Sequence, residues 1–232
     1  MSLYGQLTER NGVRGRSRAF SGKDDEGEPL AGHGHAYYLP TDEDGDGRLD
    51  HLTIFARNGI GERRAFDYLR GLRTDRDAQE RHELRLLLLD MGALDQDTPG
   101  PLARSAVWES ASPYIATRYA KTRGRHRRDL RLPQHRADFL LEDLREQMRL
   151  VLGIDPNAAH FEAMADERGA FRIGKRWRPI QFKRYRSKRS DDGGQKLAGA
   201  FHIRFDTAMA GPIALGHSSY FGLGLFVPVS GD

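Results

Sequence analysis

Alternating hydrophobic and polar positions begin near residue 35. The sequence HAYYLP at 35–40 has strand propensity and ends at a proline, and HLTIFAR at 51–57 is a second segment of the same kind. The polar sequence TDEDGDGRLD between them contains Asp-Gly, a dipeptide favoured in hairpin turns. The pattern therefore predicts two paired strands joined by an acidic turn.

Two segments have the periodicity of an amphipathic helix. In the segment 61–73, apolar side chains fall on one helical face: Ala65, Tyr68, Leu69 and Leu72. The segment 134–152 is more regular, and Gly153 is placed to end the helix. Its predicted buried stripe consists of Ala137, Leu140, Leu141, Leu144, Met148, Val151 and Leu152. The apolar runs at 83–90 and 105–110 have the length of buried strands.

The last third of the chain has the composition of β structure. The segments 176–189 and 195–206 flank SDDGG, a strong turn signal, which predicts a long basic hairpin. A closing strand is predicted at 221–227. The order strand–helix–strand–strand–helix–strand predicts an α+β fold of the ferredoxin-like type. Residues 1–31 lack an apolar period and are predicted to be an extended, partly flexible segment before one domain at 32–232.

Composition narrows the classes of function. The chain has 232 residues and no cysteine, which excludes disulfides, zinc–thiolate sites and thiol catalysis. No apolar run approaches the ~20 residues of a membrane helix. The first residues lack the apolar stretch of a signal peptide, so a cytoplasmic protein without a membrane partner is expected. The net charge is +4 and the isoelectric point is about 9.4.

Much of the positive charge is clustered. The segment 118–136 contains one acid, Asp129, and eight cations: Arg118, Lys121, Arg123, Arg125, Arg127, Arg128, Arg131 and Arg136. Ordinary solvated surfaces mix both signs, so this segment favours a polyanionic partner over a surface that is merely basic. RNA contacts are predicted for Arg123, Arg125, Arg127, Arg128 and Arg131.

A second basic segment spans 172–189. Trp177, Phe182 and Tyr185 alternate there with cations, a combination suited to stacking on bases while holding phosphates. The alternative is that some of these aromatic rings pack on the core. RNA contacts are predicted for Lys183, Arg184, Arg186, Lys188 and Arg189.

The C-terminal sequence GPIALGHSSYFGLGLF is rich in glycine. Glycine lets a backbone approach a ligand closely and exposes its N–H groups to phosphate. The alternative is that these glycines mark bulges and tight turns, and the sequence matches neither a P-loop nor a Rossmann fingerprint. RNA contacts are predicted for Gly216, His217, Gly222 and Gly224.

Three histidines close in sequence are candidate acid–base groups: His33, His35 and His51. If the first two strands pair, His35 and His51 are expected at the same end of the hairpin. The alternative for each is a structural or RNA-contacting role.

The turn between these strands begins like a calcium loop, D-x-D-x-D-G, with Asp42, Asp44 and Asp46. Thr53 stands where the loop would need glutamate. An acidic turn is favoured over a bound calcium ion, and neither a metal nor a cofactor is expected.

The sequences GHGHAYYLPTDEDGDGRLDHLTIFA and GPIALGHSSYFGLGLF resemble a CRISPR-associated family. It is the subunit of type I-G systems, formerly I-U, in which a fifth-family Cas part is joined to a sixth-family endonuclease part of the RAMP superfamily. The resemblance covers about 21–228 and corresponds to the endonuclease-like half, without the preceding fifth-family half.

The resemblance implies a ferredoxin-like, RNA-recognition-motif-like fold with a C-terminal glycine-rich loop. It also implies an endoribonuclease that cuts the CRISPR repeat hairpin by 2′-hydroxyl attack without metal and stays on the 3′ handle of the guide. The partners implied are guide RNA and other subunits of the type I-G complex, namely its backbone and a fifth-family-like subunit. His35 is the first catalytic candidate, with His33 or His51 as partner. The runner-up is a non-catalytic guide-binding subunit, and a metal-dependent nuclease is a distant third.

Overall fold

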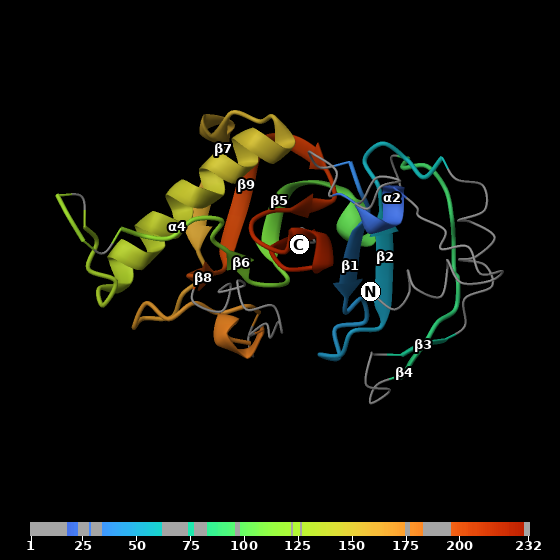
Figure 1. The fold of residues 1–232 in the computed structure, drawn as a ribbon, viewed down its shortest axis with the longest axis horizontal. Helices are drawn as coiled ribbons and strands as arrows, with labels where there is room; N and C mark the ends of the chain where they lie inside the picture. Colours follow the sequence, from blue (N-terminus) through green and yellow to red (C-terminus); the bar gives the residue numbers. More distant parts are fainter. Residues whose placement is uncertain are drawn as a thin grey trace. The chain divides into compact units, whose positions relative to one another are not determined.

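The structure, a computed structural model, describes residues 18–22, 28, 34–61, 74–76, 83–95, 98–121, 123–125, 127–174, 177–182 and 196–229 (Figure 1). The chain divides into two compact units, Met1–Tyr37 with Ile54–Leu94, and Tyr38–Thr53 with Asp95–Asp232. The sequence predicted one domain over 32–232, whereas this division assigns 32–37 and 54–94 to the first unit. Among the described residues, no helix is both long and apolar enough to cross a membrane.

The second unit contains an antiparallel sheet with the strand order β10–β11–β5–β9–β7. In that order the strands span Ile213–Ala214, Leu225–Pro228, Arg104–Ser110, Phe201–Ala210 and Ala159–Ala163. The helix α4, Pro133–Gln147, lies in the chain between β5 and β7, and Figure 1 shows it beside β7 and β9. Mixed helix and antiparallel sheet make this an α+β protein, as predicted.

Alternation along the strands gives the sheet one apolar face. In β9, Phe201, Ile203 and Phe205 are buried, while His202 and Arg204 between them are half-buried and exposed. The buried side chains form one core with α4, and Figure 1 shows the helix and these strands together. Truncating a buried leucine or isoleucine to alanine typically lowers the free energy of unfolding by about 2–5 kcal/mol.

The strongest predicted helix is confirmed. Pro133 begins α4, because the fixed φ of proline suits the first helical position and its missing N–H is not needed there. The helix continues as one π-helical turn, η2, at Met148–Leu152. Gly153 then ends it with a φ of 69°, the left-handed conformation that glycine adopts without steric cost. From the predicted stripe, Leu140, Leu144 and Met148 are fully buried.

The predicted acidic hairpin is also confirmed. The strands β1, Tyr37–Thr41, and β2, His51–Phe55, pair with each other. Tyr37, Leu39 and Thr41 are buried in alternation, which is the pattern of a strand with one face on a core. The backbone N–H of Asp50 donates to the carbonyl of Thr41 at 3.1 Å and closes the loop.

Two predicted strands differ in the structure. The apolar run 83–90 was predicted to be a buried strand, but only Glu83–Arg85, β4, is extended, paired with β3 at Thr74–Arg76. Leu87 and Leu89 in that run are 75% and 68% exposed. The closing strand β11 begins only at Leu225, after the short 3₁₀ helix η6 at Ser219–Phe221.

The basic hairpin prediction is right in one arm. Its second arm contains β8, Ala198–Gly199, and β9, whereas Pro179–Phe182 in the first arm forms a 3₁₀ helix, η4. Proline has no N–H to donate to a strand ladder, which disfavours a strand there. Residues 183–195, and the predicted helix over most of 61–73, lie outside the described residues.

The remaining described elements are short. They are α2 at Arg18–Ser21, β6 at Tyr114–Ile115, and the 3₁₀ helices η1 at Gly100–Leu102 and η3 at Pro156–Ala158. The strand β6 pairs with β8, opposing Tyr114 to Gly199 and Ile115 to Ala198. This pair brings the start of the basic segment 118–136 next to the chain that precedes β9.

Candidate nucleic-acid interface

Two arginines of the basic segment are bound to α4. The Nε of Arg118 donates to Asp143 at 3.0 Å, and an Nη of Arg128 donates to Glu142 at 2.6 Å. Both guanidinium groups also lie over the ring of Phe139, at 5.3 and 5.7 Å from its centre. Their charges are therefore used within the protein. Arg128 was predicted to contact RNA; the structure pairs it with Glu142 at the surface, and its RNA contact stays a prediction.

Asp143 anchors the beginning of the basic segment. Its side chain is 1% exposed and accepts hydrogen bonds from the Tyr114 hydroxyl at 2.7 Å and from the Thr117 N–H at 2.7 Å. The Thr117 hydroxyl donates to its other oxygen at 3.0 Å, beside Arg118. Burial, and then the charge of Asp143, raise the pKa of the Tyr114 hydroxyl, which stays protonated and able to donate. These bonds fix the chain where it leaves β6.

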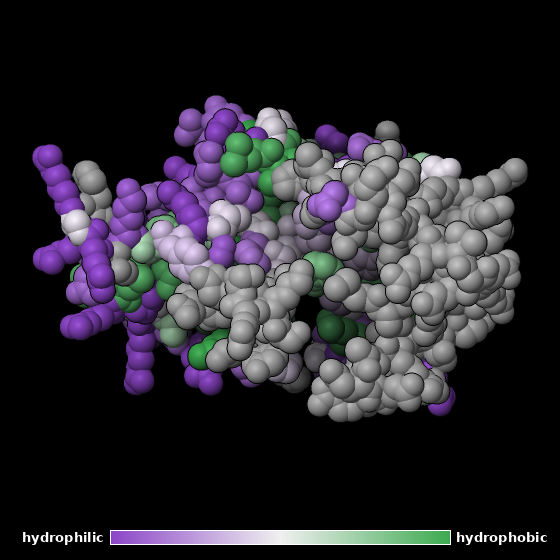
Figure 2. Space-filling view, viewed as in Figure 1, coloured by the Kyte–Doolittle hydropathy of each residue, from purple (hydrophilic) through white to green (hydrophobic). Residues whose placement is uncertain are grey.

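The rest of the segment presents cations that the fold does not use. Within the described part of the chain, the cationic groups of five exposed residues make no hydrogen bond or ion pair: Lys121, Arg123, Arg125, Arg127 and Arg131. Figure 2 shows a strongly hydrophilic surface at the left of the view, where this segment runs in Figure 1.

Backbone hydrogen bonds close this segment into a defined loop. The N–H of Arg128 donates to the carbonyl of Lys121 at 2.7 Å, and that of Arg127 to Gly124 at 3.2 Å. An open pocket of about 640 Å³ is lined by Arg127, Arg128, Asp129, Leu130 and Arg131. We call residues 121–131 the cationic loop. Its composition suits a ligand that carries several negative charges.

The second basic segment is described only in part. The five cations predicted there, Lys183, Arg184, Arg186, Lys188 and Arg189, lie outside the described residues. Among its aromatic residues, Trp177 is 41% exposed, and its ring contacts that of Phe182 edge-on at 6.4 Å.

The glycines of the C-terminal segment approach the protein's own backbone. A Cβ atom on Gly224 would lie 1.8 Å from the carbonyl oxygen of Leu215, and one on Gly216 would lie 2.5 Å from that of Ile115. Both glycines have positive φ, 63° and 90°. The packing of this segment therefore explains its glycines, as the turn alternative expected.

Hydrogen bonds hold the same segment in place. The N–H of Gly224 donates to Pro113 at 2.8 Å, and that of His217 to Ile115 at 2.8 Å. Gly222 has a φ of 80° and accepts a bond from the Ser112 hydroxyl at 2.6 Å. The RNA contacts predicted at Gly216, His217, Gly222 and Gly224 remain predictions, because the internal packing neither needs nor excludes them.

The three candidate histidines are in different environments. His33 lies outside the described residues. His35 is half-buried, a Cβ atom on Gly22 would lie 2.8 Å from its ring, and burial lowers its pKa. His51 is the more accessible, with a side chain 37% exposed. Its Nδ1 lies 2.9 Å from Asp50, and this hydrogen bond raises the pKa of His51.

The expected placement of His35 and His51 at one end of the hairpin is wrong. The chain reverses only after Thr41, and the Asp50–Thr41 hydrogen bond places His51 beside the last residue of β1. His35 precedes the first residue of β1, so the length of the strand separates the two histidines along the ladder.

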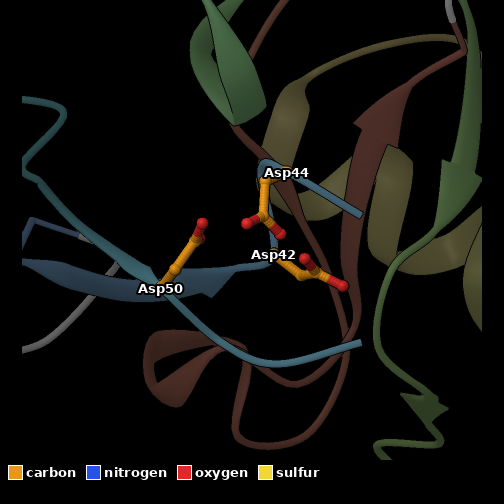
Figure 3. Close-up of side chains that lie close together, drawn as sticks. All are labelled: Asp42, Asp44 and Asp50. Carbon is orange, nitrogen blue, oxygen red and sulfur yellow. The ribbon is translucent and has the colours of Figure 1, made fainter. Parts of the chain in front are cut away.

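The acidic turn is built from bonds between carboxylates and backbone N–H groups. Asp42 accepts from Gly45 at 2.9 Å and from Gly47 at 2.8 Å, and Asp50 accepts from Glu43 at 3.0 Å. Figure 3 shows Asp42, Asp44 and Asp50 gathered at this turn, and each offers an oxygen within 4.8 Å of the others. Oxygen ligands of this kind suit a hard cation, although calcium takes 6–8 of them. The turn itself is confirmed, and no metal is needed to account for it.

Sequence reasoning missed the polar face of the sheet. His202 opposes Glu109 on one side and Glu162 on the other, and Arg204 opposes His160. The Nδ1 of His202 lies 3.9 Å from the Glu109 carboxylate. The alternation within FHIRFD could have located these outward positions, but their neighbours come from strands far apart in sequence.

No family model, no curated protein and no solved structure matches this chain.

Proposed function

We propose that this chain is an RNA-binding domain that holds CRISPR repeat or guide RNA through the cationic loop. The observation that carries the proposal is the set of five exposed cations with no partner among the described residues, on a loop closed by backbone bonds. Neighbouring arginines in the same segment are paired with acids of α4. The unpaired cations are therefore available to an external polyanion.

The chemistry of the loop favours a nucleic-acid backbone over a small anion. Several guanidinium groups spread over one loop match a chain of phosphates, and each contact releases bound counterions. The aromatic residues of the neighbouring segment add surfaces for bases. These features support RNA, in agreement with the resemblance to the type I-G subunit and its partners.

The strand order supports the finer fold proposal, a ferredoxin-like domain of the RAMP kind. The strand β9 lies between β5 and β7 and is antiparallel to both, and the chain passes through α4 between them. This is the split β-α-β arrangement. With β11 beside β5, the order β11–β5–β9–β7 corresponds to fourth, first, third and second strands. The place of a second helix is taken by residues 211–224.

Cleavage of the bound RNA is a second candidate function, favoured by the Asp50–His51 pair. A carboxylate that orients an accessible imidazole is a recurring acid–base arrangement. In the proposed step a base removes the proton of a 2′-hydroxyl, whose oxygen attacks the adjacent phosphorus. The bond to the 5′-oxygen then breaks and that oxygen takes a proton, leaving a cyclic phosphate. The predicted roles of His35 and His33 belong to the same proposal.

Labelled repeat RNA tests both candidates in one experiment. The triple variant Arg123→Ala, Arg125→Ala, Arg127→Ala is expected to weaken binding at least tenfold and to reduce the salt dependence by about two charges. The matched control removes three exposed arginines elsewhere, Arg104, Arg168 and Arg204, with the same change in net charge. Equal loss in both variants would contradict a localised interface.

The same mixtures, run with and without EDTA, show whether RNA is cut. Cutting that survives EDTA and is lost in His51→Ala or His35→Ala supports the nuclease. Tight binding with intact RNA identifies the guide-binding subunit, and cutting abolished by EDTA identifies the metal-dependent alternative.

A further inference from the structure

We propose that Trp177 is a stacking site for an unpaired RNA base, so that the chain takes single-stranded nucleotides beside the phosphates held by the cationic loop. The inference rests on the proposed RNA binding and specifies its substrate class. Trp177 is 41% exposed and its neighbour Ile180 is 72% exposed. Large apolar side chains gathered at a surface mark interaction sites more often than single exposed ones do.

The local structure holds the indole in place. Ile173 and Trp177 exchange two backbone hydrogen bonds, of 2.8 and 3.1 Å. Phe182 contacts the indole edge-on, with 77° between the ring planes. The Arg178 N–H donates to the Gln181 side chain at 2.7 Å, and this bond stabilises the beginning of η4. A ring positioned before binding loses little entropy when a base stacks on it.

One cation lies beside Trp177 in the chain, and another lies just before the strand that η4 contacts. Arg178 is exposed directly beside Trp177. η4 contacts β8, and Figure 2 shows hydrophobic surface near the position of η4 in Figure 1. Just before β8, Lys196 donates to the carbonyl of Thr117 at 2.6 Å and lies 5.2 Å from the ring centre of Tyr119. Positive charge around exposed aromatic rings favours nucleic acid over an apolar peptide.

The ring that Lys196 contacts leads along the chain into the cationic loop. Tyr119 is 48% exposed and lies two residues before the first cation of that loop. Grooves for single strands combine backbone-tracking cations with rings on which successive bases stack. Bases inside a duplex are already stacked on each other, so only unpaired nucleotides offer their faces. We therefore assign the site to a single-stranded part of the RNA.

Tryptophan fluorescence gives a direct measurement. The chain has two tryptophans, and Trp108 is fully buried in the core with its Nε1 bonded to Ser105. A base that stacks on Trp177 is expected to quench its emission while Trp108 stays constant. The probes are a single-stranded oligonucleotide and an abasic oligonucleotide of equal length, which carries the same phosphates. The full chain should bind the first roughly 5- to 100-fold more tightly.

Variants of Trp177 distinguish the effect of an aromatic ring from that of a large apolar side chain. Trp177→Phe should keep most of the preference for the base-containing strand, and Trp177→Leu should lose it. Leu150→Ala, which removes an exposed apolar side chain of η2 outside the proposed site, is the matched control and should keep it.

Equal affinity for both oligonucleotides, or an unchanged preference in Trp177→Leu, would overturn the stacking site. Binding of both strands that still depends on the cationic loop would then leave the proposed function intact. Failure to bind either strand would overturn both proposals.

Discussion

The basic segment 118–136 uses the same residue types in two ways. At its start, Arg118 is bound to the buried Asp143, and Arg128 returns to Glu142 on the same helix. Between them, Lys121, Arg123, Arg125 and Arg127 have no partner among the described residues. The comparison teaches that one run of arginines can contain both residues that hold the fold together and residues whose charges are available to an external partner. Contacts with α4 separate the two classes.

The largest expected effect follows from removing Asp143, the buried carboxylate that anchors the start of the basic segment. Asp143→Ala leaves the Tyr114 hydroxyl and the Thr117 N–H without their acceptor and Arg118 without its counter-charge. Loss of one member of such a buried set costs about 3–5 kcal/mol. Urea unfolding measures it. The control is Glu146→Ala, which removes an exposed carboxylate from the same helix and should destabilise the protein far less, because solvent screens its ion pair with Arg149. Similar losses in both variants would show that the Asp143 contacts are not structural.

A smaller and sharper effect is expected at two adjacent arginines. Arg128→Ala removes an ion pair and a contact with the Phe139 ring, and is expected to cost about 1 kcal/mol of stability with little change in RNA affinity. Arg127→Ala is expected to change stability by less than about 0.5 kcal/mol. It should weaken RNA binding at low salt by roughly 3- to 10-fold. Thermal melting and a binding titration on both variants measure these two losses. If Arg127→Ala lowered stability and Arg128→Ala lowered RNA affinity, the distinction between structural and RNA-binding arginines would be wrong.

The smallest expected effect concerns the histidines. Asp50 raises the pKa of His51 in the folded protein, so their contact stabilises the fold below the ordinary histidine pKa and is lost as pH rises through the folded value. Asp50→Asn should bring the His51 pKa down toward its ordinary value. Titration of the ring protons by NMR measures this, with His35, whose pKa is lowered by burial, as the internal control. A His51 pKa that does not move in the variant would show that another group sets it.

Local patterns were sufficient for the long helix and for the first two strands. The 3.6-residue period located α4 and η2, and Gly153 marked their end. Strand propensity and the Asp-Gly turn located β1 and β2. Local patterns failed at 83–90, where continuous leucines predicted a buried strand but two of them are exposed. A run of leucines indicates that burial would be favourable, but burial also requires a neighbouring surface against which the leucines can pack.

The candidate site was less predictable because its contacts join distant residues. The glycines at 216 and 224 indicated close approach, but only the fold shows that the approach is to Ile115 and Leu215. His35 and His51 seemed adjacent across a turn, and the length of β1 separates them. Asp143 carried no signal in the sequence, because a single carboxylate on a helix is normally solvated.

The sequence by itself determined an α+β chain with a strongly amphipathic helix, an acidic hairpin and a cationic segment, because periodicity, turn chemistry and charge are local properties. The tertiary structure decided which of the described cations are paired and which have no partner among the described residues, and that Trp177 is exposed while Trp108 is buried. Those outcomes depend on which surfaces meet after folding. Pairing energy and burial arise only between groups that the fold brings into contact.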